Sequence, residues 1–233
     1  MMDKILEDKN LCKACGGRCC KKSGCDYSTS DFESIKREVI LRALETGEVS
    51  VVATFDFKRR SNGRLVSIPF LYLRARNKER DVIDLLSIKT GCSMLTDEGC
   101  IYNFQNRPTG GVNLVPMANG KCYPDKSPLE IVETWKPYQK LLGQMVKRFS
   151  GYSVDQKIRL DFMQLLEEVD NGKLDEVDEL EKEDMQGFLP LLVMAYPEVL
   201  DQYVQKSTKN NMKVVEYPKV KKKKKFKRDC HNC

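Results

Sequence analysis

Residues 12–25 read Cys-Lys-Ala-Cys-Gly-Gly-Arg-Cys-Cys-Lys-Lys-Ser-Gly-Cys, so that five cysteines fall within fourteen consecutive positions. Thiols at this density usually share a metal centre, because short loops can turn several sulfurs inward. Gly16 and Gly17 allow the tight bend that this requires between Cys15 and Cys19. The interleaved lysines and arginine can offset part of the negative charge of the gathered thiolates. This stretch therefore predicts a metal-ligating fold.

Three more cysteines lie far downstream. Gly91–Cys100 is typical of a second knuckle, with a tight turn through Asp97–Gly99, and Cys122 stands next to Tyr123-Pro124. We expect these sulfurs to converge with the N-terminal ones on a common inorganic centre. The predicted metal ligands are Cys12, Cys15, Cys19, Cys20, Cys25, Cys92, Cys100 and Cys122.

The donor set limits the chemistry of this centre. Residues 1–230 contain no histidine, which excludes mixed Cys/His zinc sites in the body of the chain. Eight thiols match two four-cysteine sites, or one cluster with four thiols to spare, and zinc and iron–sulfur clusters both accept all-thiolate ligands. The competing interpretations are disulfide pairing and burial as small core residues, and the second is most credible for Cys25.

Length and composition bound the rest of the interpretation. A chain of 233 residues can bury a substantial core without staples. Its charged beginning has no apolar signal segment, and no apolar run approaches the ~20 residues needed to span a bilayer. We therefore expect a cytoplasmic protein with no membrane partner, in which ten cysteines favour metal binding over disulfides.

The excess positive charge is concentrated at the C-terminus. Residues 219–233 contain eight of the 40 basic residues and one of the 34 acidic residues, which leaves the rest of the chain close to neutral. Lys221–Arg228 is predicted to be disordered when free, and it could bind nucleic acid or an acidic protein. A solubilising tail is the alternative. The terminal Cys230-His231-Asn232-Cys233 lacks a fourth ligand and is a weak metal signal.

Between the cysteine segments the pattern indicates a helix followed by strands. Ser30-Asp31-Phe32-Glu33 matches a capping box and predicts the start of the helix. Val49–Phe57 and Leu65–Leu73 are rich in β-branched and aromatic residues, and Asn62-Gly63 between them is a strong hairpin signal. A short strand at Val82–Leu86 is expected to extend the hairpin into a small sheet.

The C-terminal half is predicted to be helical. Ser127-Pro128-Leu129-Glu130 opens one helix, with a kink expected at Pro137, and Ser153-Val154-Asp155-Gln156 opens the next. Residues 188–204 are predicted to form a last helix, interrupted by two prolines.

The predicted fold is α+β and mainly helical, around a cysteine-ligated metal-cluster core. Residues 1–126 are expected to form a metal-binding domain with a β-hairpin or small sheet. Residues 127–206 are expected to form a helical region that packs on it, and residues 207–233 a basic tail.

The motifs Cys12-Lys-Ala-Cys15-Gly-Gly-Arg-Cys19-Cys20, Gly91-Cys92, Gly99-Cys100-Ile101-Tyr102 and Arg107-Pro108 together carry a resemblance. Over residues 12–124 the chain resembles the cysteine-cluster (YkgJ-type) family of zinc- or iron-chelating proteins. That family commonly has another cysteine between the Arg-Pro pair and a Tyr-Pro pair. Here Thr109-Gly110-Gly111 follows, and we take Cys122, beside Tyr123-Pro124, as the displaced ligand.

The resemblance implies a bound zinc ion or iron–sulfur cluster. Flagellin lysine N-methylase is a distant relative of this family, and the relation implies a cluster, expected to be [4Fe–4S], and methyl transfer from S-adenosylmethionine to lysine. It therefore favours iron–sulfur over zinc.

We expect a metal-binding protein whose cluster has a structural or redox role, and whether it is an enzyme stays open. The alternatives are a zinc-stabilised nucleic-acid-binding module that uses the lysine-rich tail, and a lysine-methylase-like enzyme. Common nucleotide-binding and metalloprotease motifs are absent from the sequence. The single histidine, His231, leaves almost no material for Cys–His or Ser–His–Asp catalysis.

Overall fold

The structure is a computed structural model that describes residues 13–14, 17, 25–76, 80–87, 92–97, 99–116, 122–124, 127–172 and 179–209. The predicted ligands Cys12, Cys15, Cys19 and Cys20 lie outside the described residues, as does the basic tail from residue 210 onward. For Cys122 the backbone alone is described.

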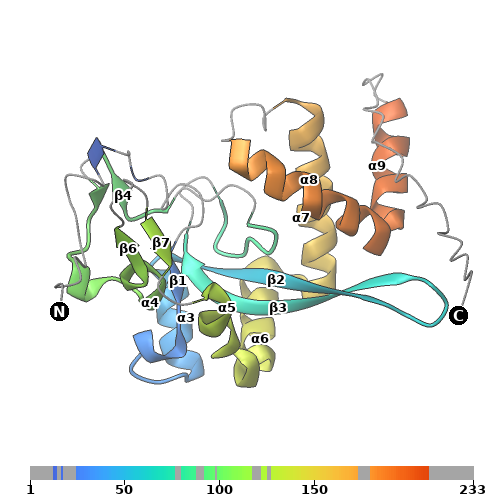
Figure 1. Ribbon diagram of the computed structural model, residues 1–233. Coiled ribbons are helices and arrows are strands. Elements are labelled where there is room, and N and C mark those ends of the chain that lie inside the picture. Colours follow the sequence, from blue (N-terminus) through green and yellow to red (C-terminus); the bar gives the residue numbers. More distant parts are fainter. Residues whose placement is uncertain are drawn as a thin grey trace, which may run out of the picture.

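In the first half of the chain, the described residues form short strands, one long hairpin and three short helical segments next to one regular helix (Figure 1). In order these are β1 (Asp26–Tyr27), the 3-10 helix η1 (Thr29–Asp31), α3 (Arg37–Glu45), β2 (Val49–Arg59), β3 (Leu65–Ala75), β4 (Leu95–Thr96), β5 (Gly99–Cys100), η2 (Phe104–Asn106), α4 (Thr109–Val112), β6 (Leu114–Pro116) and β7 (Cys122–Pro124).

The second half is helical in the residues described. It contains α5 (Pro128–Glu133), η3 (Lys136–Tyr138), α6 (Gln139–Ser150), α7 (Val154–Asp170), α8 (Glu179–Ala195) and α9 (Pro197–Lys209). The predicted α+β class is therefore confirmed, with a small antiparallel sheet beside a largely helical second half.

The predicted hairpin is confirmed. Strands β2 and β3 pair antiparallel from Val49↔Ala75 to Arg59↔Leu65, and β1 pairs with the other edge of β3. In the connecting loop, Gly63 has φ +81° and donates its N–H to the Arg60 carbonyl at 2.9 Å. That left-handed conformation is the reason why glycine suits this position. The hairpin forms a long twisted arm (Figure 1).

The segment predicted as a strand at Val82–Leu86 does lie beside the hairpin, but it forms a single parallel bridge, Val51↔Ile83. Val51 N–H donates to the Val82 carbonyl at 2.8 Å, and Ala53 N–H donates to the Leu85 carbonyl at 3.2 Å. An extended loop, rather than a full strand, therefore borders β2.

The helix start predicted at Ser30 is wrong. The capping residue is Ser28, whose N–H donates to Asp31 Oδ2 at 2.7 Å, and it opens only the short η1. Phe32 is then extended (φ −118°, ψ 144°), and its ring lies 5.7 Å from that of Trp135. Helix α3 begins only at Arg37, after the extended residue Lys36.

The other helix signals are confirmed at Ser127 and Ser153, whose side chains accept hydrogen bonds from the first turns of α5 and α7. At Pro137 the expected kink is a complete break, where η3 separates α5 from α6. The single helix predicted for residues 188–204 is instead two helices. Pro190 lies inside α8, and Pro197 begins α9, where its missing N–H costs no helical hydrogen bond.

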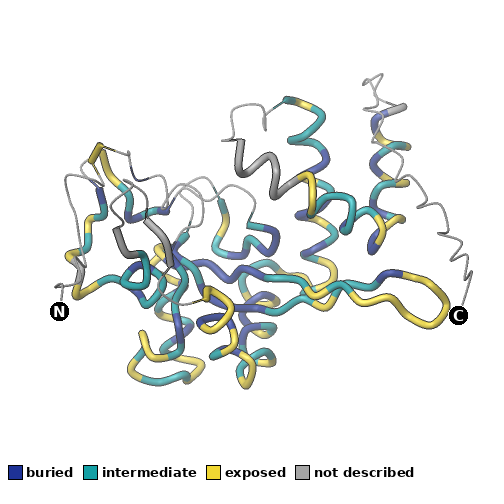
Figure 2. Tube along the Cα trace, viewed as in Figure 1, coloured by how far each residue is buried: buried dark blue, intermediate teal, exposed yellow. Residues whose placement is uncertain are grey.

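One hydrophobic core joins the hairpin to the helical half. Among its fully buried side chains are Leu73 of β3, Trp135 between α5 and η3, Leu142 of α6 and Phe162 of α7. Figure 2 shows burial along the base of the hairpin and exposure at its far end. Within the described helices, none has both the length and the apolar character needed to cross a membrane.

Candidate functional site

Three of the predicted ligands lie in one small cluster. Cys25 and Cys92 are buried with Ala75 and Met94, and Cys100 packs against them. None of the three sulfurs is in a disulfide. The fold therefore brings Cys25, Cys92 and Cys100 into one cluster, although β2, β3 and the 80–87 loop separate the first from the other two along the chain.

The environment of Cys25 disfavours the thiolate form of its side chain. Burial raises the pKa of the Cys25 thiol, and the neighbouring Cys92, Cys100 and Asp26 raise it further, while Arg107 opposes them. A positively charged ion at the cluster would reverse this balance, because thiolates are the form in which cysteine binds a metal.

Two glycines allow the backbone to approach this cluster closely. A Cβ at Gly111 would lie 2.4 Å from Cys25 Sγ, and a Cβ at Gly110 would lie 2.5 Å from the backbone nitrogen of Asp26. Helix α4 can therefore sit directly against β1 and the Cys25 sulfur. The Gly-Gly pair, which the sequence analysis treated only as a departure from the family pattern, has a structural reason.

A third glycine connects the N-terminal cysteine run to the same region. Gly17 is buried with φ +69°, and a Cβ there would lie 2.3 Å from Leu95 Cδ1. Leu95 begins β4, which pairs with β5 through Leu95↔Cys100. Gly17, which lies between the predicted ligands Cys15 and Cys19 in the sequence, is therefore close to the segment that carries Cys92 and Cys100.

Within the described ranges, which include Cys25, Cys92 and Cys100, no group of three or more Cys, His, Asp or Glu side chains is arranged to hold a metal ion. The three clustered thiols match the donor chemistry of a thiolate-rich centre but would form only part of its ligand set. The remaining predicted sulfurs are those of the N-terminal run, whose Gly17 lies against Leu95, and that of Cys122.

A buried ion pair attaches β1, and with it Cys25, to the hairpin. Arg74 Nε donates to Asp26 Oδ1 at 2.7 Å, and the same guanidinium donates to Tyr72 Oη at 2.7 Å and to Ser87 Oγ at 3.1 Å. The Ala75 N–H donates to the Cys25 carbonyl at 2.8 Å. These contacts hold the first of the three thiols in position.

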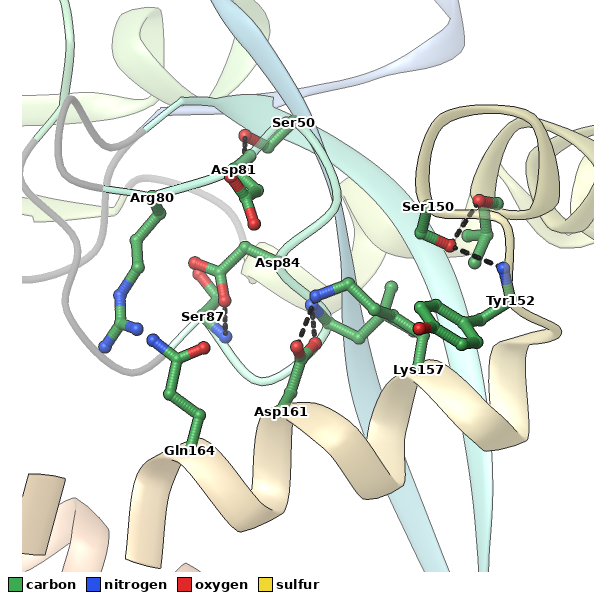
Figure 3. Close-up of polar contacts among 12 residues, drawn as sticks. Ser50, Arg80, Asp81, Asp84, Ser87, Ser150, Tyr152, Lys157, Asp161 and Gln164 are labelled. Atoms are coloured by element: carbon green, nitrogen blue, oxygen red, sulfur yellow. Dashed lines mark hydrogen bonds and ion pairs between the residues drawn. The ribbon is translucent and has the colours of Figure 1, made fainter. Parts of the chain in front are cut away.

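The structure also contains a charged pocket of about 190 Å³ that the sequence analysis missed. Loop 80–87 and helix α7 form it, and Figure 3 shows Asp84 of the loop facing Gln164 and Asp161 of the helix. One signal was available in the sequence. Asp161 falls on the apolar face of α7 with Ile158 and Phe162, and a carboxylate there needs a buried partner.

Three of the charged residues that line this pocket form ion pairs. Arg80 makes a two-pronged ion pair with Glu168, at 2.9 and 2.7 Å, and Lys157 pairs with Asp161. Asp161 Oδ2 also accepts from the Leu85 N–H at 3.0 Å, and Asp84 Oδ1 accepts from the Ser87 N–H at 3.1 Å. The network joins loop 80–87 to α7.

Desolvation, with a further contribution from Asp161, raises the pKa of Asp84 to about 6, although Arg80, the Ser87 N–H and Lys157 oppose the shift. The folded protein therefore binds a proton here more tightly than the unfolded chain does. This contribution to stability is present at low pH and is lost as the pH rises toward and above about 6.

We predict that Asp84→Asn, which keeps an acceptor for the Ser87 N–H, will stabilise the protein more at pH 8 than at pH 4, by about 1–3 kcal/mol. Urea unfolding of wild type and variant across this range measures the difference. Asp81→Asn, which removes an exposed carboxyl from the same rim, controls for simple loss of charge. A constant difference at all pH values would contradict the prediction.

Comparisons with protein-family models, with curated proteins and with solved structures find no match to this chain. Functional inference therefore depends on the residues themselves.

Proposed function

We propose that this chain is a cytoplasmic metal-binding protein of the cysteine-cluster (YkgJ-type) kind. Its centre, an iron–sulfur cluster or zinc, would be held by thiolates and have a structural or redox role. The observation that supports the proposal is the clustering of Cys25, Cys92 and Cys100, which the sequence analysis had selected as ligands for independent reasons.

The position of the cluster suits a structural role. Cys25 precedes β1, Cys92 precedes β4 and Cys100 ends β5, so a shared centre would cross-link segments that are otherwise held by very short strands. The contact of Gly17 with Leu95 supports the addition of the N-terminal run to the same centre. Zinc would supply the cross-link alone, whereas an iron–sulfur cluster would also supply an electron-transfer group.

The first test is the metal content and absorption spectrum of protein purified without oxygen, for wild type and for Cys92→Ser. In wild type we expect stoichiometric zinc, or iron with visible absorption. In Cys92→Ser the metal content should fall at least about tenfold, because the remaining ligands hold the metal less tightly when one thiolate is removed. Cys230→Ser is the matched control, since Cys230 is outside the proposed ligand set.

A second variant in the same measurement is Gly111→Ala. Its new methyl group would push directly on Cys25 Sγ, so metal content should fall without removal of any thiol. Gly143→Ala on α6 is the control, because its Cβ would meet only Val154 Cγ2 at 3.8 Å, an ordinary contact. A folded wild-type protein without metal, or equal losses in Cys92→Ser and Cys230→Ser, would refute the proposed function.

A further inference from the structure

The loop of the β2–β3 hairpin is the most concentrated basic surface in the described chain outside the helices. Residues 58–64 read Lys-Arg-Arg-Ser-Asn-Gly-Arg, and all seven are exposed. We call these residues the hairpin tip. Figure 2 shows the tip as a continuous exposed stretch at the end of the arm.

The arm behind the tip is braced, so that the tip is held away from the body. The rings of Phe55 and Phe57 stack at 6.1 Å, and Phe188 of α8 packs against both, at 5.5 and 6.0 Å. Further out, the hydroxyl groups of Ser67 and Tyr196 are hydrogen-bonded. The two strands have 11 residues each, so the hairpin is about 35 Å long from its buried base to the tip.

The charges of the tip are only partly neutralised by nearby acids. Lys58 pairs with Asp56 at 3.1 Å, in a contact where both side chains are mostly exposed. Arg59 donates to the Gly63 carbonyl at 2.7 Å, which shapes the loop and leaves its charge uncompensated. Among the contacts of the described residues, Arg60 has no side-chain hydrogen bond or ion pair.

One further acid lies within electrostatic reach of the tip. Partial burial acts to raise the pKa of Glu198, but its hydrogen bonds and the charges of Arg159 and Arg64 lower it. The hydrogen bonds of Glu198 include one from Arg159, so this carboxylate is not available to neutralise Arg64 fully. The tip therefore keeps a net positive charge.

We propose that the hairpin tip is a contact site for the phosphate backbone of double-stranded DNA. This inference is independent of the proposed metal-binding function. It differs from the sequence-based prediction for the lysine-rich tail, because it assigns DNA contact to a folded element.

The shape and chemistry of the tip favour DNA over a membrane surface. A two-stranded antiparallel ribbon has the width that enters the major groove of a B-form duplex. Three of the four cations are arginines, whose planar guanidinium groups bind phosphate with two hydrogen bonds. A membrane surface is a poorer match, since residues 58–64 have no apolar side chain to insert and the exposed Ile68 lies back along β3.

The test measures binding of the full chain to a fluorescent 20-base-pair duplex as a function of salt. The tip variant carries Arg59→Gln, Arg60→Gln and Arg64→Gln, and the charge-matched control carries Lys140→Gln, Lys147→Gln and Arg148→Gln, three exposed cations of α6. Each lost phosphate contact lowers the log–log salt slope by about 0.9. We expect the tip variant to bind at least about tenfold more weakly at ~0.1 M salt, with a slope lower by about 2–3.

The same comparison is made in a background in which Lys221, Lys222, Lys223, Lys224 and Lys225 are all glutamine, which separates the tip from the tail. Equal losses in the tip and α6 variants, or unchanged binding of the tip variant in both backgrounds, would overturn the proposal. Absence of duplex binding by wild type, with or without binding to phosphatidylserine vesicles, would also overturn it. Metal content is measured on the same samples. A negative result for DNA binding therefore does not decide whether the protein binds a metal.

Discussion

Replacement of Arg74 by alanine is expected to lower the free energy of unfolding by about 3–5 kcal/mol. The Arg74–Asp26 pair is largely buried, with 16% and 12% of the two side chains exposed. Loss of the guanidinium would leave the Asp26 carboxylate without its partner inside the protein and would remove the donors to Tyr72 and Ser87. Urea unfolding followed by circular dichroism measures the change.

Arg42→Ala provides the matched control for this prediction. Arg42 also pairs with an acid, Glu33, but at 3.3 Å and with 70% and 73% of the two side chains exposed. Solvent screening reduces such a pair to about 0.5 kcal/mol or less. If the two arginine variants lost similar stability, the buried pair would not have the role assigned to it in holding β1 and Cys25.

Replacement of Trp135 by alanine is the second change with a large expected effect, about 3–5 kcal/mol for the cavity alone. The indole is fully buried, packs edge-on against Phe32 and Tyr138, and donates its Nε1–H to the Tyr27 carbonyl at 2.7 Å. The side chain thus joins the helical half to β1, and its loss should also add about 1 kcal/mol for the broken hydrogen bond.

Trp135→Phe should recover much of that stability, since it keeps an aromatic ring but cannot donate to Tyr27. Tyr152→Ala, at an aromatic residue that is 45% exposed, is the control and should change stability by less than about 1 kcal/mol. The midpoint and slope of urea unfolding report the differences. If Trp135→Ala were as stable as Tyr152→Ala, Trp135 would not be the buried core residue described above.

The hairpin and the helix starts could be predicted because their signals are local. Gly63 provides the left-handed backbone that the loop needs, and Ser153 and Gln156 cap α7 across three residues. Where two local signals competed, the prediction was wrong. Ser28 and Ser30 both precede an acid by three residues, and the structure uses Ser28, because Asp31 also accepts hydrogen bonds from Thr109 far along the chain.

Metal ligation by the cysteines stays a prediction, while the structure bears on where three of them lie. Cysteine spacing selected Cys25, Cys92 and Cys100, and the structure brings these three together. The sequence could not reveal that Gly110 and Gly111 let α4 approach Cys25, because that contact depends on how α4 packs against β1. The charged pocket was missed for a similar reason, since Asp84 and Asp161 come from elements that meet only in the folded chain.

The amino-acid sequence by itself determined where the hairpin turns and that positive charge gathers at the C-terminus, and it is the source of the predicted thiol ligands. These properties depend on residue type and short spacing. Only the tertiary structure decided that Arg74 is buried against Asp26, that Asp84 faces α7, and that a second basic surface stands at the end of a braced arm. Such features follow from packing between distant segments, whose energies are absent from any local stretch of the chain.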